Sequence, residues 1–213
     1  MNNPAIKGII TPIITPMNPD ESVNLPELRN QIERQIAGGV HGIFCFGTNG
    51  EGYILSTQEK EEILEATIDQ VKGRVPVYAG TGRYATRQTI ELTKAAAEAG
   101  CDGALVILTY YMKPHKRAVM DNFRRLHREC PDIDIMSYNN PWFAGLELDA
   151  NDVKELMDEG VWRSIKSAHG DVNRIHDLKN TCGDGMVVMY GHDYDPMEAF
   201  FAGADGWLSG LPA

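Results

Sequence analysis

The sequence predicts an α/β protein built as a closed (β/α)8 barrel, the TIM-barrel fold. Eight short apolar runs alternate with helix-like stretches along the 213 residues, and this alternation indicates parallel strands joined by crossover helices. One run, Ala104 to Leu108, is apolar without interruption, which is typical of a strand covered on both faces. Because there are eight such runs, a closed barrel is favoured over an open doubly wound sheet.

Each predicted strand except the last is followed by a predicted helix. The strand runs cover residues 8–17, 42–47, 76–82, 103–110, 133–139, 161–167, 186–190 and 206–211. The helical stretches cover residues 25–37, 57–71, 86–99, 117–128, 149–158, 172–180 and 196–202. Several helix ends carry their own signals. Ser56 and Glu59 fit a capping box, and glycines at 38–39, 73, 100, 160 and 203 fit helix stops.

The runs form one predicted domain, residues 1–213, which is incomplete at its C-terminal end. A barrel of this kind typically has about 250 residues and an eighth helix, whereas this chain ends at Pro212 and Ala213, just after the eighth run. We therefore expect the eighth helix and any C-terminal helical segment to be missing. The outer face of the first and eighth strands then lacks its usual cover, which predicts association or instability.

The amino-acid composition limits the kinds of binding partner and the cell compartment that we expect for this protein. A net charge of −10 and a pI near 5.0 argue against a nucleic-acid-binding surface. No apolar run reaches about 18 residues, and the N-terminus lacks the apolar core of a signal peptide, so we expect no membrane span. The four cysteines lack metal-type spacing and are expected to be reduced, mostly buried thiols of a cytoplasmic protein. They are Cys45, Cys101, Cys130 and Cys182.

Lys166 is the most informative residue, because it lies at the end of a buried strand run, residues 161–167. A buried lysine is costly unless it is neutral, paired or chemically used. Burial lowers the pKa of the amine toward about 7–8, and a neutral amine can form a Schiff base with a carbonyl substrate. The alternative is a lysine that reaches the rim and pairs with a carboxylate.

Other reactive side chains follow the same ends of the strands, where barrel enzymes carry their active sites. In chain order these strand ends are residues 15–16, 47–51, 80–83, 109–111, 138–141, 166, 191–193 and 209–210. They bring a lysine, several tyrosines and a glycine-rich loop to one mouth. Each feature alone has a plain structural explanation: a turn at 47–51, rim packing for Tyr110 and Tyr111, and a core tyrosine at Tyr138.

Together, the motifs resemble those of the dihydrodipicolinate synthase / N-acetylneuraminate lyase superfamily of class I, Schiff-base-forming aldolases and lyases. The resemblance covers nearly the whole chain. It rests on Gly47-Thr48-Asn49-Gly50-Glu51, Tyr110-Tyr111, Tyr138-Asn139-Asn140-Pro141, Ile165-Lys166 and the turn at 203–206. It implies a metal-independent lyase that holds a 2-oxo acid as an imine and needs no further cofactor. It also implies a homodimer or homotetramer, if the natural chain is longer.

The resemblance gives each site residue a role. Lys166 condenses with the C2 carbonyl of pyruvate or of a hydroxylated 2-oxo acid, and Tyr138 shuttles the proton. Thr48 relays that proton, and Tyr111 completes the relay from across a dimer interface. The amides and side chains of Thr48 and Asn49 hold the substrate carboxylate. The substrate-binding residues implied are Gly47, Asn49, Gly191, Asp193, Leu208 and Ser209.

At three positions this sequence differs from the residue pattern of the family, and each difference concerns the substrate. Dihydrodipicolinate synthases carry an arginine shortly after the Tyr-Asn-x-Pro motif for the carboxylate of a second substrate, but Phe143 stands there in this chain. A phenyl ring cannot replace an arginine fork, so we expect a lyase other than authentic dihydrodipicolinate synthase. Asn49 replaces the second threonine of the loop. Asp193 stands where sugar-acid lyases place a carboxylate for substrate hydroxyls, so a dehydratase or deaminase of the same family stays open.

Hypotheses from other classes also stay open. A metal-dependent enzyme would use His169, His192, Asp193 and Glu51, although no helix-borne His pair or Cys cluster supports it. A barrel that binds 2-oxo acids without turnover fits an incomplete site. A phosphate-binding loop at residues 80–83 is only weakly indicated, since part of a glycine fingerprint is present there.

Overall fold

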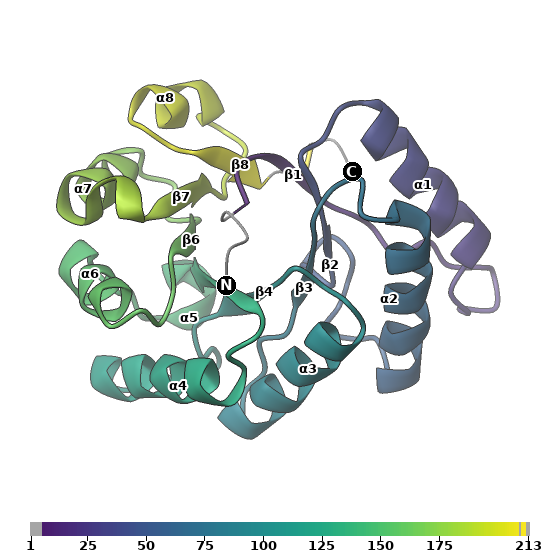
Figure 1. The fold of residues 1–213 in the computed structure, drawn as a ribbon, viewed down its shortest axis with the longest axis horizontal. Coiled ribbons are helices and arrows are strands. Elements are labelled where there is room, and N and C mark those ends of the chain that lie inside the picture. The colour runs from purple at the N-terminus through teal and green to yellow at the C-terminus, as the bar shows by residue number, and fades with distance from the viewer. Residues whose placement is uncertain (1–5, 209, 212–213) are drawn as a thin grey trace.

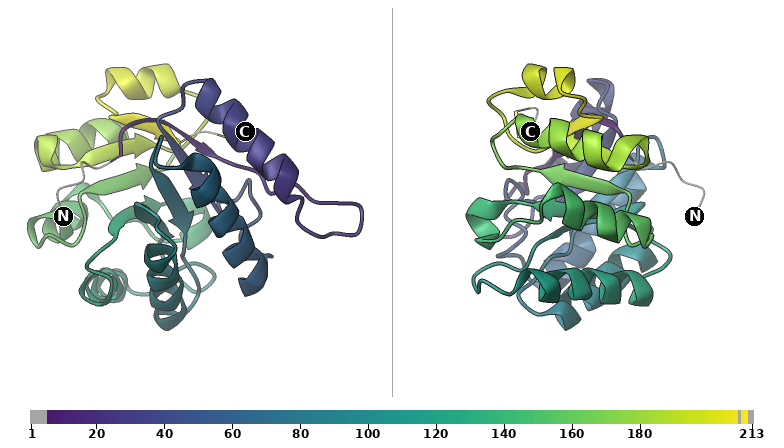
Figure 2. Two further views of the ribbon diagram at one scale, coloured as in Figure 1. Left: turned by 45° about the vertical axis from the view of Figure 1, so that its right-hand side comes forward. Right: turned by 90° about the vertical axis from the view of Figure 1, so that its left-hand side faces the viewer.

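The computed structural model describes residues 6–208 and 210–211, and it has the predicted TIM-barrel architecture. Eight parallel strands follow one another around the ring in chain order, and β1 closes the ring by pairing with β8. Helices surround the ring on the outside in all three views (Figures 1 and 2). The strands are β1 Gly8–Pro12, β2 Gly42–Cys45, β3 Val77–Gly80, β4 Gly103–Ile107, β5 Asp134–Asn139, β6 Ser164–Ser167, β7 Val187–Tyr190 and β8 Gly206–Leu208.

The outer helices begin close to their predicted positions. They are α1 Leu25–Ala37, α2 Thr57–Val71, α3 Thr86–Glu98, α4 Lys116–Glu129, α5 Pro141–Ala144, α6 Ala150–Asp158, α7 Asn173–Cys182 and α8 Pro196–Phe201, with the 3-10 helix η1 at Gly183–Gly185. The bounds of α1 and α2 match the prediction because side chains fix their starts. The Asn24 side chain accepts a hydrogen bond from the Glu27 amide, and Ser56 and Glu59 form a reciprocal capping box.

The structure differs from the predicted elements in two ways. The strands are shorter than the apolar runs because several runs continue into buried loop residues; β1 ends at Pro12, while Ile13 beyond it is still buried. The sequence also did not predict α5, a helix of four residues. The Asn140 side chain starts this helix by accepting hydrogen bonds from the amides of Trp142 and Phe143.

Apolar side chains fill two separate layers. The larger layer lies between the strands and the helices and includes Ile43, Val106 and Ile165. The smaller one fills the inside of the barrel, with residues such as Phe44 and Met189. Because the barrel interior is packed in this way, it is a core and not a pore.

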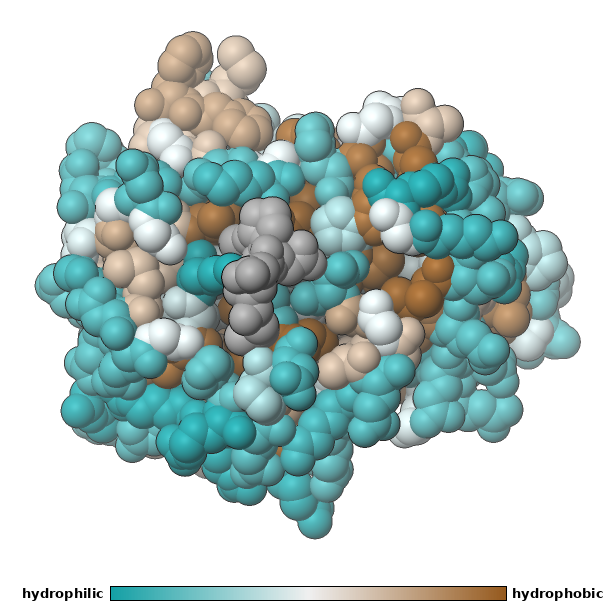
Figure 3. All heavy atoms as spheres, viewed as in Figure 1, coloured by the Kyte–Doolittle hydropathy of each residue, from teal (hydrophilic) through white to brown (hydrophobic). Residues whose placement is uncertain are grey.

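Within the described part of the chain no helix follows β8, and α8 lies beside β8 on the outside of the ring (Figure 1). Trp207 on β8 is half-buried, and its indole N–H donates to the His192 carbonyl at 2.9 Å. On neighbouring α8, Phe201 is 86% exposed. Elsewhere the face shown in Figure 3 is mostly hydrophilic, with apolar residues visible between the helices.

The composition predicted buried, reduced cysteines and no membrane span. The four cysteines are buried free thiols, and burial raises the pKa of Cys45 to about 12, which makes this thiol unreactive. Across the described ranges, we find no helix with the length and apolar character needed to span a bilayer.

Candidate functional site

A cavity of about 610 Å³ opens at the carboxyl ends of the strands, and we call it the inner cavity. Lys166 lies in its wall. Most of the other predicted site residues also line it, namely Gly47, Thr48, Asn49, Tyr138, Gly191, Asp193 and Leu208. Tyr111 does not, and Ser209 lies outside the described residues. Residues from widely separated parts of the sequence therefore meet at one place, as the strand-end pattern predicted.

Lys166 reaches the cavity from β6, a strand whose four residues are all buried. Its side chain is 8% exposed, and its Nζ lies 4.4 Å from the centre of the Tyr138 ring on neighbouring β5. Burial lowers the pKa of Lys166 to about 8, although the Asp193 carboxylate acts in the opposite direction. About a tenth of the amine is therefore neutral at pH 7, and the neutral amine is the form that attacks a carbonyl.

Gly191, just after β7, leaves room for the lysine. A Cβ atom at this position would lie 2.5 Å from Cε and 2.9 Å from Cγ of Lys166. Both distances are well inside van der Waals contact, so any side chain at 191 would have to push the amine away. Because Gly191 has no side chain, it leaves the Lys166 side chain in its position in the cavity wall.

The Tyr138 phenol is held by a neighbour in sequence. Its oxygen accepts a hydrogen bond from the Asn140 side-chain amide at 3.0 Å. Burial raises the pKa of Tyr138, and the hydrogen bond from Asn140 opposes that rise, so the phenol stays protonated near neutral pH. Because the Asn140 carbonyl oxygen also caps α5, one amide both starts this helix and orients the phenol. In the sequence, Asn140 stands out only as part of the motif at residues 138–141, which does not reveal this role.

The glycine-rich loop after β2 is anchored to the rest of the barrel. The Thr15 hydroxyl donates to the Gly50 carbonyl at 2.7 Å, and the Glu51 amide donates to the Thr48 carbonyl at 3.1 Å. Phe46 and Glu51, which flank the loop, have φ values of 63° and 50°, a left-handed conformation that is uncommon for residues other than glycine. This backbone leaves Thr48 and Asn49 exposed in the cavity wall.

The two adjacent tyrosines after β4 lie in different places. Tyr110 lines the inner cavity. Tyr111 is 85% exposed, has a φ of 75°, and contacts the ring of Tyr84 edge-on with 5.9 Å between centroids. A single chain therefore does not bring Tyr111 to Lys166. Its supply from a second copy stays a prediction.

The residues of the metal hypothesis do not gather. His169 pairs with Glu147 at 3.4 Å, and the His192 ring packs on Tyr194. Over residues 6–208 and 210–211, no group of three or more His, Cys, Asp or Glu side chains is placed to hold a metal ion.

The loop at residues 80–83 is also unlike a phosphate cradle. The Thr81 hydroxyl hydrogen-bonds with Thr93 at 2.8 Å in the buried layer outside the barrel. Gly80, Gly82 and Arg83 line the inner cavity instead. Arg83 was not among the predicted site residues, because its only signal in the sequence is this partial glycine motif.

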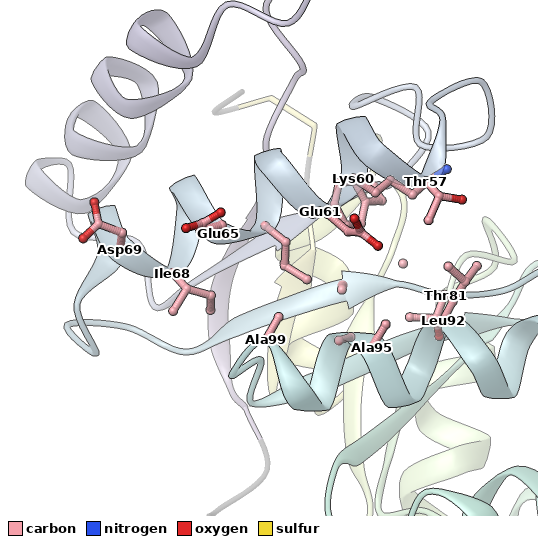
Figure 4. Close-up of a pocket in the computed structure, with 15 residues that line it drawn as sticks. Thr57, Lys60, Glu61, Glu65, Ile68, Asp69, Thr81, Leu92, Ala95 and Ala99 are labelled. Atoms are coloured by element: carbon pink, nitrogen blue, oxygen red, sulfur yellow. The ribbon is translucent and has the colours of Figure 1, made fainter.

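A second cavity, of about 360 Å³, lies outside the barrel between α2 and α3, and we call it the outer groove (Figure 4). Lys60, Glu61 and Glu65 line it from α2, while Ala95 and Ala99 line it from α3. Burial, followed by the charge of Arg83, lowers the pKa of Lys60 to about 8. Phe46 and Gly80 line both cavities, so the two spaces share a wall.

Comparison with known sequences identifies relatives along almost the whole chain. The model of the dihydrodipicolinate synthetase family matches residues 5–211. The 4-hydroxy-tetrahydrodipicolinate synthase of Syntrophus aciditrophicus is 37% identical over 203 residues, which is 95% of this chain and 69% of the relative. The enzyme of the same name from Psychrobacter arcticus is 36% identical over 204 residues, or 96% of this chain and 67% of the relative.

Solved structures have the same fold. A putative dihydrodipicolinate synthetase from Pseudomonas aeruginosa superposes with a TM-score of 0.93 at 32% identity, over 98% of this chain and 72% of that one. A prophage protein of the dihydrodipicolinic acid synthase family from E. coli K12, solved in complex with pyruvate, gives a TM-score of 0.91 at 32% identity. The superposition covers 96% of this chain and 70% of that one.

Proposed function

Because this chain belongs to the dihydrodipicolinate synthetase family of aldolase-type lyases, we propose that it forms a Schiff base between Lys166 and a 2-oxo acid. The substrate proposed is pyruvate or a hydroxylated 2-oxo acid. One observation carries the proposal: a buried lysine with a lowered pKa lies in a cavity beside a tyrosine ring at 4.4 Å. The pyruvate complex of the E. coli K12 relative supports this substrate class.

In the proposed reaction, the neutral Lys166 amine adds to the C2 carbonyl, and loss of water gives a protonated imine. The protonated imine withdraws electrons from C3. Either the C3–H bond breaks and a base takes the proton, or the C3–C4 bond breaks and an aldehyde leaves, and in both cases the bonding electron pair stays behind in an enamine. Thr48 and Asn49 are proposed to bind the substrate carboxylate, which their exposed position in the cavity wall supports. This chemistry needs no metal or further cofactor, because the imine itself accepts the electrons.

Tyr138 is proposed to carry the proton. Its phenol is near the amine, is protonated near neutral pH, and is held by Asn140 at 3.0 Å. A positioned acid-base group of this kind typically contributes about 10²–10⁴-fold to the rate. Thr48 is the proposed relay between the phenol and the mouth.

We propose that the electrophile or leaving group differs from that of authentic dihydrodipicolinate synthase. Phe143 lines the cavity from α5, and a phenyl ring offers no donor to a carboxylate. Asp193, also in the wall, suits a hydroxylated substrate. A dehydratase or deaminase would keep the same imine and release water or ammonia, so it is the second candidate.

The proposal includes association of copies of this chain in the cytoplasm. Large side chains from the loops after β2, β3 and β4 are exposed together on the mouth, including Tyr53, Tyr84, Tyr111 and Met112 at 67%, 62%, 85% and 69%. Such a patch favours a protein interface. The mass in solution, measured by light scattering, tests this directly: the proposal predicts a dimer or larger assembly.

The test of the chemistry is the intact mass after incubation with pyruvate and sodium borohydride. The proposal predicts one added reduced pyruvate on the wild-type chain and none on Lys166→Ala. A folded wild-type chain that gains no adduct, from pyruvate or from hydroxylated 2-oxo acids, would instead favour a barrel without turnover.

A further inference from the structure

Arg83 is a second cation in the wall of the inner cavity. Its guanidinium donates to the backbone carbonyls of Gly82 at 2.8 Å and Gly52 at 3.3 Å. Its backbone amide donates to the Thr89 hydroxyl at 3.0 Å, which fixes the chain at the start of α3. Hydrogen bonds therefore hold both the backbone and the guanidinium of Arg83 in place.

The charge of Arg83 has no carboxylate counterpart in the described ranges. A guanidinium has five N–H donors, and both of its hydrogen bonds here go to neutral carbonyls. Asp193 is the acidic residue among those lining the cavity, and its charge acts on Lys166. The cavity thus has a local excess of positive charge, although the chain as a whole has a net charge of −10.

Aromatic rings line the same cavity as this cation. Tyr84 and Tyr110 pack with 4.5 Å between ring centroids, and both line the cavity together with Phe143. Burial raises the pKa of the Tyr110 phenol, and the charge of Arg83 opposes that rise. The volume of about 610 Å³ leaves space beyond a three-carbon acid held at Lys166.

We propose that Arg83 determines specificity by binding a second carboxylate, at the end of the substrate remote from the imine. The inference deepens the proposed function and rests on it for the position of the imine. Arginine is suited to this task because its planar fork matches a carboxylate with two N–H donors. The preferred substrates are then dicarboxylates, with the carbon chain between the two acid groups lying against Tyr84, Tyr110 and Phe143.

The test compares 2-oxo acids of equal length that end in a carboxylate or in a methyl group. The pairs are 2-oxoglutarate with 2-oxopentanoate, and 2-oxoadipate with 2-oxohexanoate. For each acid, the concentration that half-saturates borohydride trapping is measured on the wild type, Arg83→Gln, Arg83→Lys and Arg87→Gln. Arg87 is the matched control, because it lies on α3 with an exposed side chain and its partner is Glu91 at 3.8 Å.

We expect the wild type to favour the dicarboxylate about tenfold or more in at least one pair, which corresponds to about 1.4 kcal/mol. Arg83→Gln should abolish this preference, Arg83→Lys should retain part of it, and Arg87→Gln should leave it unchanged. The inference is overturned if no pair shows a preference, or if the preference survives Arg83→Gln. Circular dichroism checks the fold, and Arg83→Lys carries the test if Arg83→Gln does not fold.

A second readout separates this inference from the proposed chemistry. Glutarate and adipate have no carbonyl at C2, so their binding, followed by NMR line broadening, does not depend on an imine. Binding that Arg83→Gln weakens and Arg87→Gln does not would support the carboxylate site even if Lys166 trapped nothing. If pyruvate is trapped but the diacids bind equally well to the wild type and to Arg83→Gln, the inference about Arg83 is refuted. The proposed lyase chemistry is then unaffected.

Discussion

Two lysines of this chain share a lowered pKa but lie in different surroundings. Burial lowers the pKa of Lys166 and of Lys60 to about 8. Lys166 ends in the inner cavity, 4.4 Å from the centre of a tyrosine ring. Lys60 lies in the outer groove and donates to the Leu55 carbonyl. At neutral pH each amine is therefore mostly charged, with a minor neutral fraction that is larger than for an ordinary lysine.

The difference lies in what accompanies each amine. Lys166 shares its cavity with the Tyr138 phenol, the proposed proton carrier, and with Thr48 and Asn49, which are proposed to bind the acid group. The outer groove has alanines on one side and Glu61 and Glu65 on the other, which repel the carboxylate of a 2-oxo acid. A lowered pKa identifies a lysine as a candidate nucleophile. The side chains that surround each lysine then distinguish one candidate from the other.

The largest expected effect comes from removing Tyr138, the proposed proton carrier of the inner cavity. In Tyr138→Phe, we expect exchange of the C3 protons of pyruvate in D₂O to slow by about 10²–10⁴-fold, while the imine still forms. Proton NMR of pyruvate measures the exchange rate. Lys60→Gln, which changes the outer groove, is the control and should exchange at the wild-type rate. A Tyr138→Phe chain that exchanges as fast as the wild type would remove Tyr138 from the mechanism.

A smaller effect is expected from Gly191→Ala, which fills the space next to the nucleophile. The new Cβ would lie 2.5 Å from Cε of Lys166, and a displacement of about 1 Å can cost roughly 10²-fold in rate. We therefore expect the rate of borohydride trapping to fall by about that factor. Gly185→Ala is the matched control, because the nearest atom to its Cβ is the Met157 sulfur at 3.7 Å. Equal trapping by both variants would contradict the positioning role of Gly191.

The third prediction concerns stability and its dependence on pH. Burial lowers the folded-state pKa of Lys166 from 10.5 to about 8. Below pH 8 the amine is charged in both states, and folding bears the cost of burying it. Lys166→Met should therefore raise the free energy of unfolding at pH 7 by about 3 kcal/mol. The gain should fade between pH 8 and 10.5, where the wild-type amine becomes neutral in the unfolded chain as well.

Urea unfolding of the wild type and of Lys166→Met at pH 7 and pH 10 measures this gain. Lys60→Met is the comparison, since its amine is closer to solvent and its gain should be much smaller. A stability gain for Lys166→Met that is absent at pH 7, or that does not shrink at pH 10, would show that the buried charge carries no such cost.

The sequence predicted the fold well where chemistry marks the boundaries. The helix over residues 57–71 was placed correctly because Ser56 and Glu59 form a local signal at its start. The predicted strand bounds were too long because burial continues beyond the strand ends. Ile13, just after β1, is buried, and its amide still donates to the Phe44 carbonyl at 3.0 Å. The four-residue helix α5 was not predicted, because its cap, Asn140, lies in the motif at residues 138–141, which was interpreted as a strand end that carries site residues.

The sequence predicted which side chains come together in the candidate site where their positions depend only on the ends of the strands. Lys166, Tyr138 and Gly191 belong to neighbouring strands or their ends, so the barrel order alone brings them together. Whether Tyr110 or Tyr111 enters the cavity depends on a backbone φ of 75° at residue 111, which the sequence does not reveal. Arg83 was missed for a similar reason, because the path of a long side chain depends on the carbonyls that it contacts.

The most direct test of the account uses both lysines in one sample. The wild-type chain is incubated with pyruvate and borohydride at pH 7 and pH 9, digested, and mapped by mass spectrometry. The account predicts reduced pyruvate on Lys166, formed faster at pH 9 because more of the amine is neutral, with Lys60 unmodified at both pH values. Labelling of Lys60 to the same extent as Lys166, or labelling of Lys60 alone, would contradict the claim that the inner cavity makes Lys166 the nucleophile.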